Sequence, residues 1–178
     1  MLHRHLARTI AALALVTTSA ALGARPGDAA TTPAVLGPPW ISIEYPVNPY
    51  DNDARGAYLM VHAFHHQQPT GFPVEGRAEG LVAGARKTVT LEFRATSKSG
   101  VYALTQQWPK EGSWVLVIDA KQGENDRATA LVEIGKDGRL SGVRVPTRPM
   151  NNGYPVPAGV TAADVDAALL RVSRTAAN

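Results

Sequence analysis

The sequence predicts an all-β fold, a β-sandwich of seven to eight strands followed by a short C-terminal helix. Short runs of alternating apolar and polar residues follow one another between Trp40 and Val145, a period typical of half-buried strands. Glycine, proline and asparagine separate these runs at close spacing, as in strands joined by turns. Near the end of the chain, apolar residues recur at helical spacing, which predicts a helix there. A closed barrel with the same number of strands is the main alternative.

Eight segments carry the strand pattern, and two of them show it most clearly. Residues 86–95 place Val89, Leu91 and Phe93 on one face and polar side chains on the other, so one face should meet solvent. Residues 114–120 are apolar on nearly both faces, as expected for a central strand. The other expected strands are residues 40–44, 58–66, 77–82, 101–108, 128–134 and 140–145.

Turn and helix signals complete the domain, which we assign to residues 40–145. Lys136, Asp137 and Gly138 join the last two expected strands, and an Asp-Gly pair is typical of a β-hairpin. The proline-rich segment 146–160 is interpreted as a connector, because proline cannot donate a hydrogen bond inside a sheet.

Residues 161–174 are predicted to form the C-terminal helix. Thr161 and Asp164 resemble a capping box. An apolar stripe follows at helical spacing, made of Val165, Ala168, Leu169 and Val172. We expect this helix to cover one edge or end of the sheet; recognition of a partner by the helix is the alternative.

Residues 1–24 have the pattern of a secretory signal peptide. Two arginines and no acidic residue come first, residues 9–22 form an apolar run too short to span a membrane, and small residues follow. We expect cleavage after Ala24, then a flexible segment, 25–39, leading into the domain. An uncleaved membrane anchor is the alternative. The protein is therefore expected to be exported to the periplasm or beyond, with no stable membrane span after cleavage.

Charge and cysteine content narrow the possible partners. The sequence has 18 basic and 15 acidic residues, and without Arg4 and Arg8 of the predicted leader 16 and 15 remain, a net charge of +1. A nearly neutral domain is not expected to bind nucleic acid. Because there are no cysteines, neither disulfides nor zinc–thiolate sites stabilise the fold. This composition favours a bacterial envelope protein over a small eukaryotic secreted one.

No sequence motif indicates a reaction, so no catalytic or cofactor-binding residue is assigned and the protein is expected not to be an enzyme. Residues 80–88 look superficially like a phosphate-binding loop, but a strand and not a helix follows them. The chain has no Gly-x-Ser-x-Gly or His-Glu-x-x-His motif. Glu75 and Glu79 would share one strand face, where solvated acids are expected in preference to a glycosidase pair.

The histidines that follow the predicted leader lie within five residues of one another. Strand alternation would place Met60, His62, Phe64 and His66 on one face and His65 on the other. Residues four apart on a strand are about 13 Å apart, so a shared cation would need His62 with Met60, or His66 with a neighbouring strand. Thioether and imidazole ligands suit copper. Met60, His62, His65 and His66 are therefore candidate copper ligands, and the alternative is a polar strand end and turn at residues 65–68 with no cofactor.

Aromatic residues offer a second candidate site, for a sugar or a peptide. Trp114 lies inside an apolar strand and is expected in the core, whereas Trp108 is expected to be half-exposed at a strand end. The aromatic residues considered are Trp40, Tyr45, Tyr50, Tyr58, Trp108 and Trp114.

Three motifs resemble one bacterial family. Residues 71–77 (GFPVEGR), 99–104 (SGVYAL) and 109–117 (PKEGSWVLV) occur in the order of the turns and strands of the YtkA-like and FixH-like extracytoplasmic domains. The resemblance covers residues 58–123. It implies an immunoglobulin-like β-sandwich that serves as an accessory or binding module of the cell envelope, and it transfers no catalytic residue.

The sequence as a whole predicts an exported, non-enzymatic binding or scaffolding module. Its partner is expected to be an envelope protein or a small ligand. The two alternatives are a periplasmic copper-handling protein and a carbohydrate- or peptide-binding module.

Overall fold

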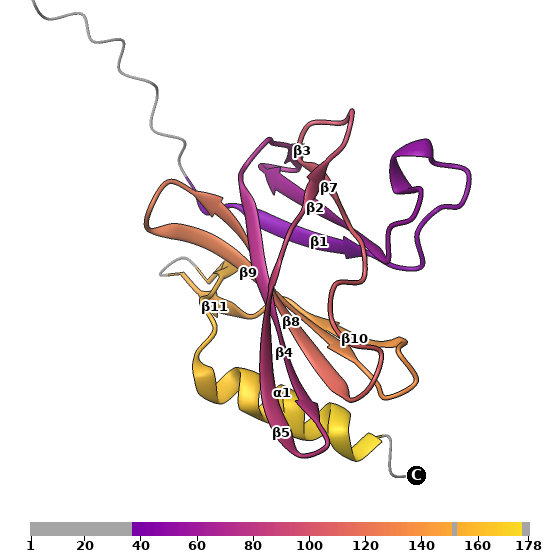
Figure 1. Cartoon of the computed structure of the whole chain (residues 1–178). Helices are drawn as coiled ribbons and strands as arrows, with labels where there is room; N and C mark the ends of the chain where they lie inside the picture. Colours follow the sequence, from indigo (N-terminus) through magenta and orange to yellow (C-terminus); the bar gives the residue numbers. More distant parts are fainter. Residues whose placement is uncertain (1–36, 151–152, 176–178) are drawn as a thin grey trace, which may run out of the picture. The chain divides into compact units, whose positions relative to one another are not determined.

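The computed structural model describes residues 37–150 and 153–175. The predicted signal peptide, 1–24, and most of the predicted flexible segment that follows it lie outside these residues. Two antiparallel sheets pack face to face, and a helix follows them (Figure 1). Within the described ranges no hydrogen-bonded strand pair joins the two sheets, so the fold is a sandwich and not a closed barrel.

The first sheet has the strand order β1–β2–β7–β6, with β3 pairing with the end of β2. Its strands are β1 (Trp40–Glu44), β2 (Leu59–His65), β3 (Gln68–Pro69), β6 (Arg94–Ala95) and β7 (Val101–Leu104). Ile41, Leu59 and Val61 point inward to the core. The alternate residues of β1 and β2 therefore form the outer face of this sheet.

The second sheet has the order β10–β9–β8–β4–β5. Its strands are β4 (Val74–Val82), β5 (Ala85–Leu91), β8 (Ser113–Gln122), β9 (Asp126–Ile134) and β10 (Leu140–Arg144). The prediction of a central strand at residues 114–120 is confirmed, since β8 lies between β4 and β9 and is buried on both faces. The predicted hairpin is also confirmed: the backbone N–H of Gly135 donates to the carbonyl of Arg139, and Gly138 has φ +75°.

Trp114 fills the core between the two sheets, as predicted, and is 1% exposed. Its partner across the β4–β8 ladder is Gly80. A Cβ atom on Gly80 would lie 2.4 Å from atoms of the indole ring. The indole N–H donates to the carbonyl oxygen of Glu111 at 2.9 Å, so the one polar atom of the side chain is satisfied.

The helix α1 (Ala162–Thr175) begins at a capping box, as the sequence predicts. The Asp164 carboxylate accepts hydrogen bonds from the backbone N–H and the hydroxyl of Thr161, and the Thr161 hydroxyl accepts one from the Asp164 N–H. These bonds satisfy N–H groups that the first helical turn leaves free. No helix of the described ranges is long and apolar enough to cross a membrane.

The position of α1 corrects one expectation. We expected the helix at an edge or end of the sheet, but it lies across the outer face of the second sheet, over β8, β9 and β4 (Figure 1). The predicted stripe is buried there against Val115, Val117 and Leu131. An apolar central strand needs cover on both of its faces, and α1 supplies the second one.

Residues 86–95 form two strands and not the single strand expected. β5 ends at Leu91 in the second sheet, and β6 begins at Arg94 in the first. The Gln107 side chain holds the crossover by accepting from the backbone N–H of Glu92 and donating to its carbonyl oxygen, at 2.8 and 2.7 Å. Leu91 and Phe93 still face the core, as alternation predicts.

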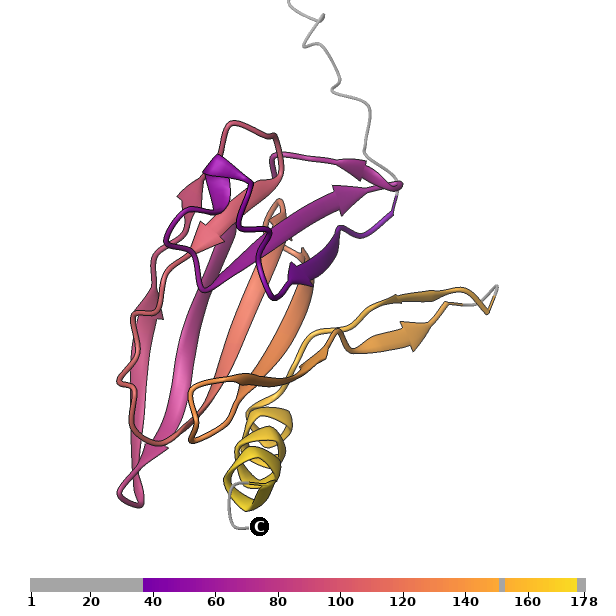
Figure 2. The same ribbon diagram turned by 90° about the vertical axis from the view of Figure 1, so that its right-hand side faces the viewer.

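The predicted connector 146–160 contains a hairpin. β11 (Thr147–Pro149) pairs with β12 (Pro155–Pro157), and Figure 2 shows this two-stranded sheet standing away from the two larger sheets. The segment interpreted as a connector thus forms a small sheet of its own and adds no central strand to either larger sheet. β3, β6, β11 and β12 have two or three residues each, so the seven to eight strands expected correspond to the eight longer strands of the described ranges.

Ion pairs connect the outer face of the second sheet to α1. Glu79 of β4 accepts hydrogen bonds from Arg77, at 2.7 Å, and from Arg86, and Arg86 also binds Asp166 of the helix. Burial raises the pKa of Glu79, but the hydrogen bonds and charges of the two arginines outweigh burial and hold this pKa below its ordinary value. Glu75 pairs instead with Lys121, so the two acids considered in the sequence are engaged separately.

Replacing Glu79 should give a pH-dependent loss of stability. Because the pKa of this carboxyl is lowered by folding, its contribution is complete above the unfolded value of 4.5 and disappears as the pH falls through the folded value. Glu79→Gln should cost about 1.5–3 kcal/mol at pH 7, the range for hydrogen bonds to charged groups. Urea unfolding of the wild type and the variant should give curves that converge below pH 4.5. The exposed Glu124→Gln is the control, and a difference that persists at low pH would contradict this origin.

Candidate functional site

The outer face of the first sheet carries the side chains that form the candidate site. Alternation directs every second residue of β1 and β2 away from the core. The register pairs Trp40 with Phe64, Ser42 with His62 and Glu44 with Met60. Two aromatic rings therefore lie beside each other at one end of this face, and polar groups follow toward the other end.

A cavity of about 530 Å³ opens at the aromatic end and is lined by Trp40, Phe64, His66 and Gln67. Its volume lies within the usual range of small-molecule sites. Trp40 is 36% exposed, whereas the chain's other two tryptophans, Trp108 and Trp114, are 4% and 1% exposed. An exposed indole at a cavity wall is an anchor for a flat apolar group.

The cavity wall includes a tight turn, at the place where a polar strand end and turn was the alternative to metal ligands. β2 ends at His65, which pairs with Gln68 of β3, so His66 and Gln67 form a two-residue hairpin turn. Their φ angles are +47° and +65°. Asparagine and glycine are the residues that adopt this turn with least strain, and strained residues in turns are concentrated at functional sites. Strand alternation therefore does not fix the position of the His66 side chain, which lines the cavity together with Trp40 and Phe64 of the outer face.

The turn stacks two of the predicted metal ligands on each other. The rings of His65 and His66 are 4.1 Å apart between centroids, and the His65 ring meets Phe72 edge to face at 6.2 Å. Nε2 of His65 is buried and has no hydrogen-bond partner within the described part of the chain. His66 is exposed at the cavity.

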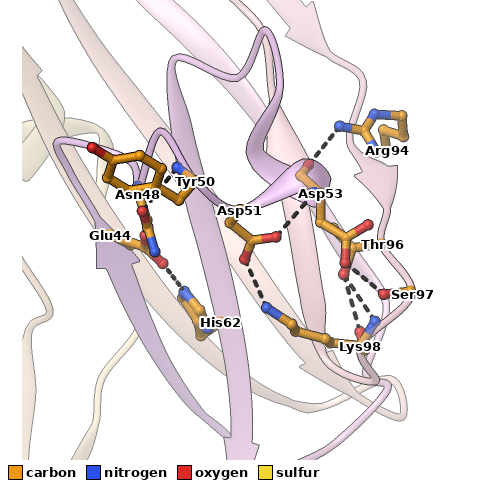
Figure 3. Close-up of polar contacts among 10 residues, drawn as sticks. All are labelled: Glu44, Asn48, Tyr50, Asp51, Asp53, His62, Arg94, Thr96, Ser97 and Lys98. Atoms are coloured by element: carbon orange, nitrogen blue, oxygen red, sulfur yellow. Dashed lines mark hydrogen bonds and ion pairs between the residues drawn. The ribbon is translucent and has the colours of Figure 1, made fainter.

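The other two predicted ligands have different neighbours. Nε2 of His62 lies 3.0 Å from a carboxylate oxygen of Glu44 (Figure 3), and the His62 ring is stacked on Phe64. Met60 is 1% exposed and packs in a small apolar cluster with Ala54. The structure thus pairs His65 with His66 and engages Met60 and His62 elsewhere. Within the described ranges, no three His, Cys, Asp or Glu side chains converge on one point.

A loop between β1 and β2 covers the part of the outer face that lies beyond His62. It contains a short 3₁₀ helix (Asn52–Ala54) and is tied to the β6–β7 turn: Lys98 donates to Asp51 at 2.7 Å, and Ser97 donates to Asp53 (Figure 3). The hydrogen bond from Lys98 lowers the pKa of Asp51. These contacts hold the loop over Met60 and leave the aromatic end open.

The predicted aromatic surface is divided between core and exterior. Trp108 was expected to be half-exposed, but it is buried and meets Tyr58 edge to face at 5.1 Å. The Tyr58 hydroxyl donates to the carbonyl oxygen of Gly138, and burial raises the pKa of this phenol. Tyr45 packs on Tyr58, and Tyr50 is 92% exposed outside the cavity. Of the six aromatic residues, Trp40 lines the cavity.

Two cavity residues were missed by sequence reasoning. Phe64 was placed on the outer face but was not assigned to a site, because its pairing with Trp40 is known only from the strand register. Gln67 was interpreted as part of a polar turn, and only the fold places it beside Trp40. Comparison of the chain with protein-family models, curated proteins and solved structures gave no match.

Proposed function

We propose that this protein is an exported, non-enzymatic binding module of the cell envelope, and that its ligand site is the cavity lined by Trp40, Phe64, His66 and Gln67. The single observation that carries this proposal is the cavity itself, with an exposed indole in its wall. The leader pattern of residues 1–24 supports export.

The lining favours a ligand with a flat apolar face and a polar rim. Trp40 and Phe64 offer ring surfaces, while the Gln67 amide and the His66 imidazole can donate and accept hydrogen bonds at the edge. A sugar ring has this combination, because its axial C–H bonds form an apolar face and its hydroxyls form the rim. We therefore assign the site to a saccharide unit, and a peptide is the competing ligand in the test.

Trp40→Ala should abolish this recognition. Loss of an aromatic anchor costs more than about 1.4 kcal/mol, which is about tenfold in affinity. Because the other two tryptophans are buried, a shift of emission or protection from iodide quenching on adding ligand reports on Trp40. Wild type should respond to members of an oligosaccharide panel, and Trp40→Ala should lose binding measured by calorimetry.

The matched control is Tyr50→Ala, which removes an exposed aromatic ring outside the cavity. It should leave the affinity unchanged. If the protein responds to aromatic or proline-rich peptides and not to saccharides, the ligand of this site is a peptide. Equal affinity of Trp40→Ala and wild type for a bound saccharide would remove the cavity as the site.

A further inference from the structure

The Nε2 atoms of His65 and His66 both lie close to Gly37. A Cβ atom built on Gly37 would lie 3.3 Å from Nε2 of His66 and 3.8 Å from Nε2 of His65. Both nitrogens therefore border the same point beside Gly37. Gly37 has φ +109° and carries no side chain to fill this space.

Two features of the His65–His66 pair lower the stability of the fold unless a ligand binds to the two imidazoles. The buried Nε2 of His65 lacks a hydrogen-bond partner among the described residues, and an unsatisfied buried polar atom costs about 1–3 kcal/mol. His66 is held at φ +47° in a turn position where asparagine would be less strained. The strained backbone is what brings the second imidazole over the first. Both costs are explained if the two nitrogens share a ligand.

We propose that His65 and His66 form a two-imidazole site for a borderline divalent transition cation, with Cu²⁺ bound most tightly. Imidazole nitrogens bind such cations at about 2.0–2.1 Å, and Cu²⁺ heads the affinity order of the divalent first-row metals. The hard cations Mg²⁺ and Ca²⁺ prefer oxygen ligands and should not bind. Water, or a ligand in the adjoining cavity, would occupy the remaining coordination positions.

The assignment differs from the site expected from strand alternation. There, His62 with Met60 was the pair able to bind copper, whereas Met60 packs among aliphatic side chains and His62 is paired with Glu44. The two sites share His66, which lines the cavity, whereas His65 and Gly37 do not line it and Trp40 is not a metal ligand.

The test is a Cu²⁺ titration of the full chain, purified without a polyhistidine tag. His3→Ala and His5→Ala are present in every sample, because histidines near a free N-terminus also bind Cu²⁺. The variants are His65→Gln and His66→Asn. Asparagine suits the left-handed position of the turn, so His66→Asn removes the imidazole and favours the fold. His62→Ala is the matched control, since it removes a histidine from the same strand.

Wild type should bind one equivalent of Cu²⁺, followed by calorimetry and by quenching of Trp40. His65→Gln and His66→Asn should each weaken Cu²⁺ binding at least about tenfold. Residues that only support a metal ligand typically contribute this much to metal affinity, so loss of a ligand itself should cost no less. His62→Ala should bind as the wild type does. The electron paramagnetic resonance spectrum should show coupling to two imidazole nitrogens in the wild type and to one in each variant.

Three results would overturn the site: no Cu²⁺ binding by wild type, unchanged affinity in both histidine variants, or a spectrum without two coupled nitrogens. If His65→Gln does not fold, His66→Asn and the spectrum decide alone. Trp40→Ala should retain the two-nitrogen spectrum while losing saccharide, which separates failure of this site from failure of the saccharide site.

Discussion

Trp114→Ala should lower the free energy of unfolding by about 3–5 kcal/mol, the range for removing a large aromatic side chain from a core. The side chain is 1% exposed and fills the space between the two sheets, so its loss leaves a cavity and an unpaired carbonyl at Glu111. Urea unfolding followed by far-ultraviolet circular dichroism measures the change without relying on tryptophan emission.

Gly80→Ala tests the same contact from the opposite strand. The added Cβ would lie 2.4 Å from the indole ring, and overpacking of a core costs about 1–3 kcal/mol. In the Trp114→Ala background the ring is absent, so the same substitution should cost little and can fill part of the cavity. The double-mutant cycle should therefore show strong coupling. Additive effects would contradict the packing of Trp114 against Gly80.

Leu169→Ala should lower the free energy of unfolding by about 2–5 kcal/mol, because the side chain is buried between α1 and the second sheet. The neighbouring Leu170 is 52% exposed, and Leu170→Ala should change stability by no more than about 0.5 kcal/mol. Both substitutions create the same residue in the same helix, so helix propensity cancels in the comparison. The measurement is urea unfolding of the two variants side by side.

Equal effects of the two leucine substitutions would mean that α1 does not dock through its predicted stripe. Helical signal in far-ultraviolet circular dichroism gives a second check, since Leu169→Ala should lose it earlier in a urea titration than Leu170→Ala.

Local patterns in the sequence predicted the elements of the fold. The apolar run at residues 114–120, which covers nearly both strand faces, identified β8 as central, and Thr161 with Asp164 located the start of α1. Both signals depend on residues close together in the chain. The sequence also contained a signal for the position of α1 over β8, because a strand that is apolar on both faces must be covered on both. The prediction of the helix at a sheet edge or end did not use this signal.

Features that depend on distant residues were not predicted. The strand expected at residues 86–95 divides between two sheets, and at the crossover Gln107 binds the backbone of Glu92, a contact between segments whose proximity only the fold creates. Trp108 is buried because Tyr58 packs against it from another part of the chain. Neither contact can be predicted from the periodicity of apolar and polar residues in the sequence.

The candidate site was predicted only in part. The histidines between residues 62 and 66 were recognised as unusual, but strand alternation grouped His66 with His62. Alternation holds only while the strand continues, and β2 ends at His65. Because of the turn at His66 and Gln67, the His66 ring packs against the ring of its neighbour His65. The turn also brings Gln67 to the cavity beside Trp40.

The helix α1 also bears on self-association of the chain. Beneath it lie Val115, Val117 and Leu131, which together would form a flat apolar surface if the helix detached. Arg86 on the edge strand β5 binds Asp166 of α1, so detachment would release a contact of this edge as well. Exposed apolar sheet faces and free edges are where β proteins aggregate. The C-terminal helix therefore covers an apolar sheet surface to which the second sheet of another molecule could otherwise bind.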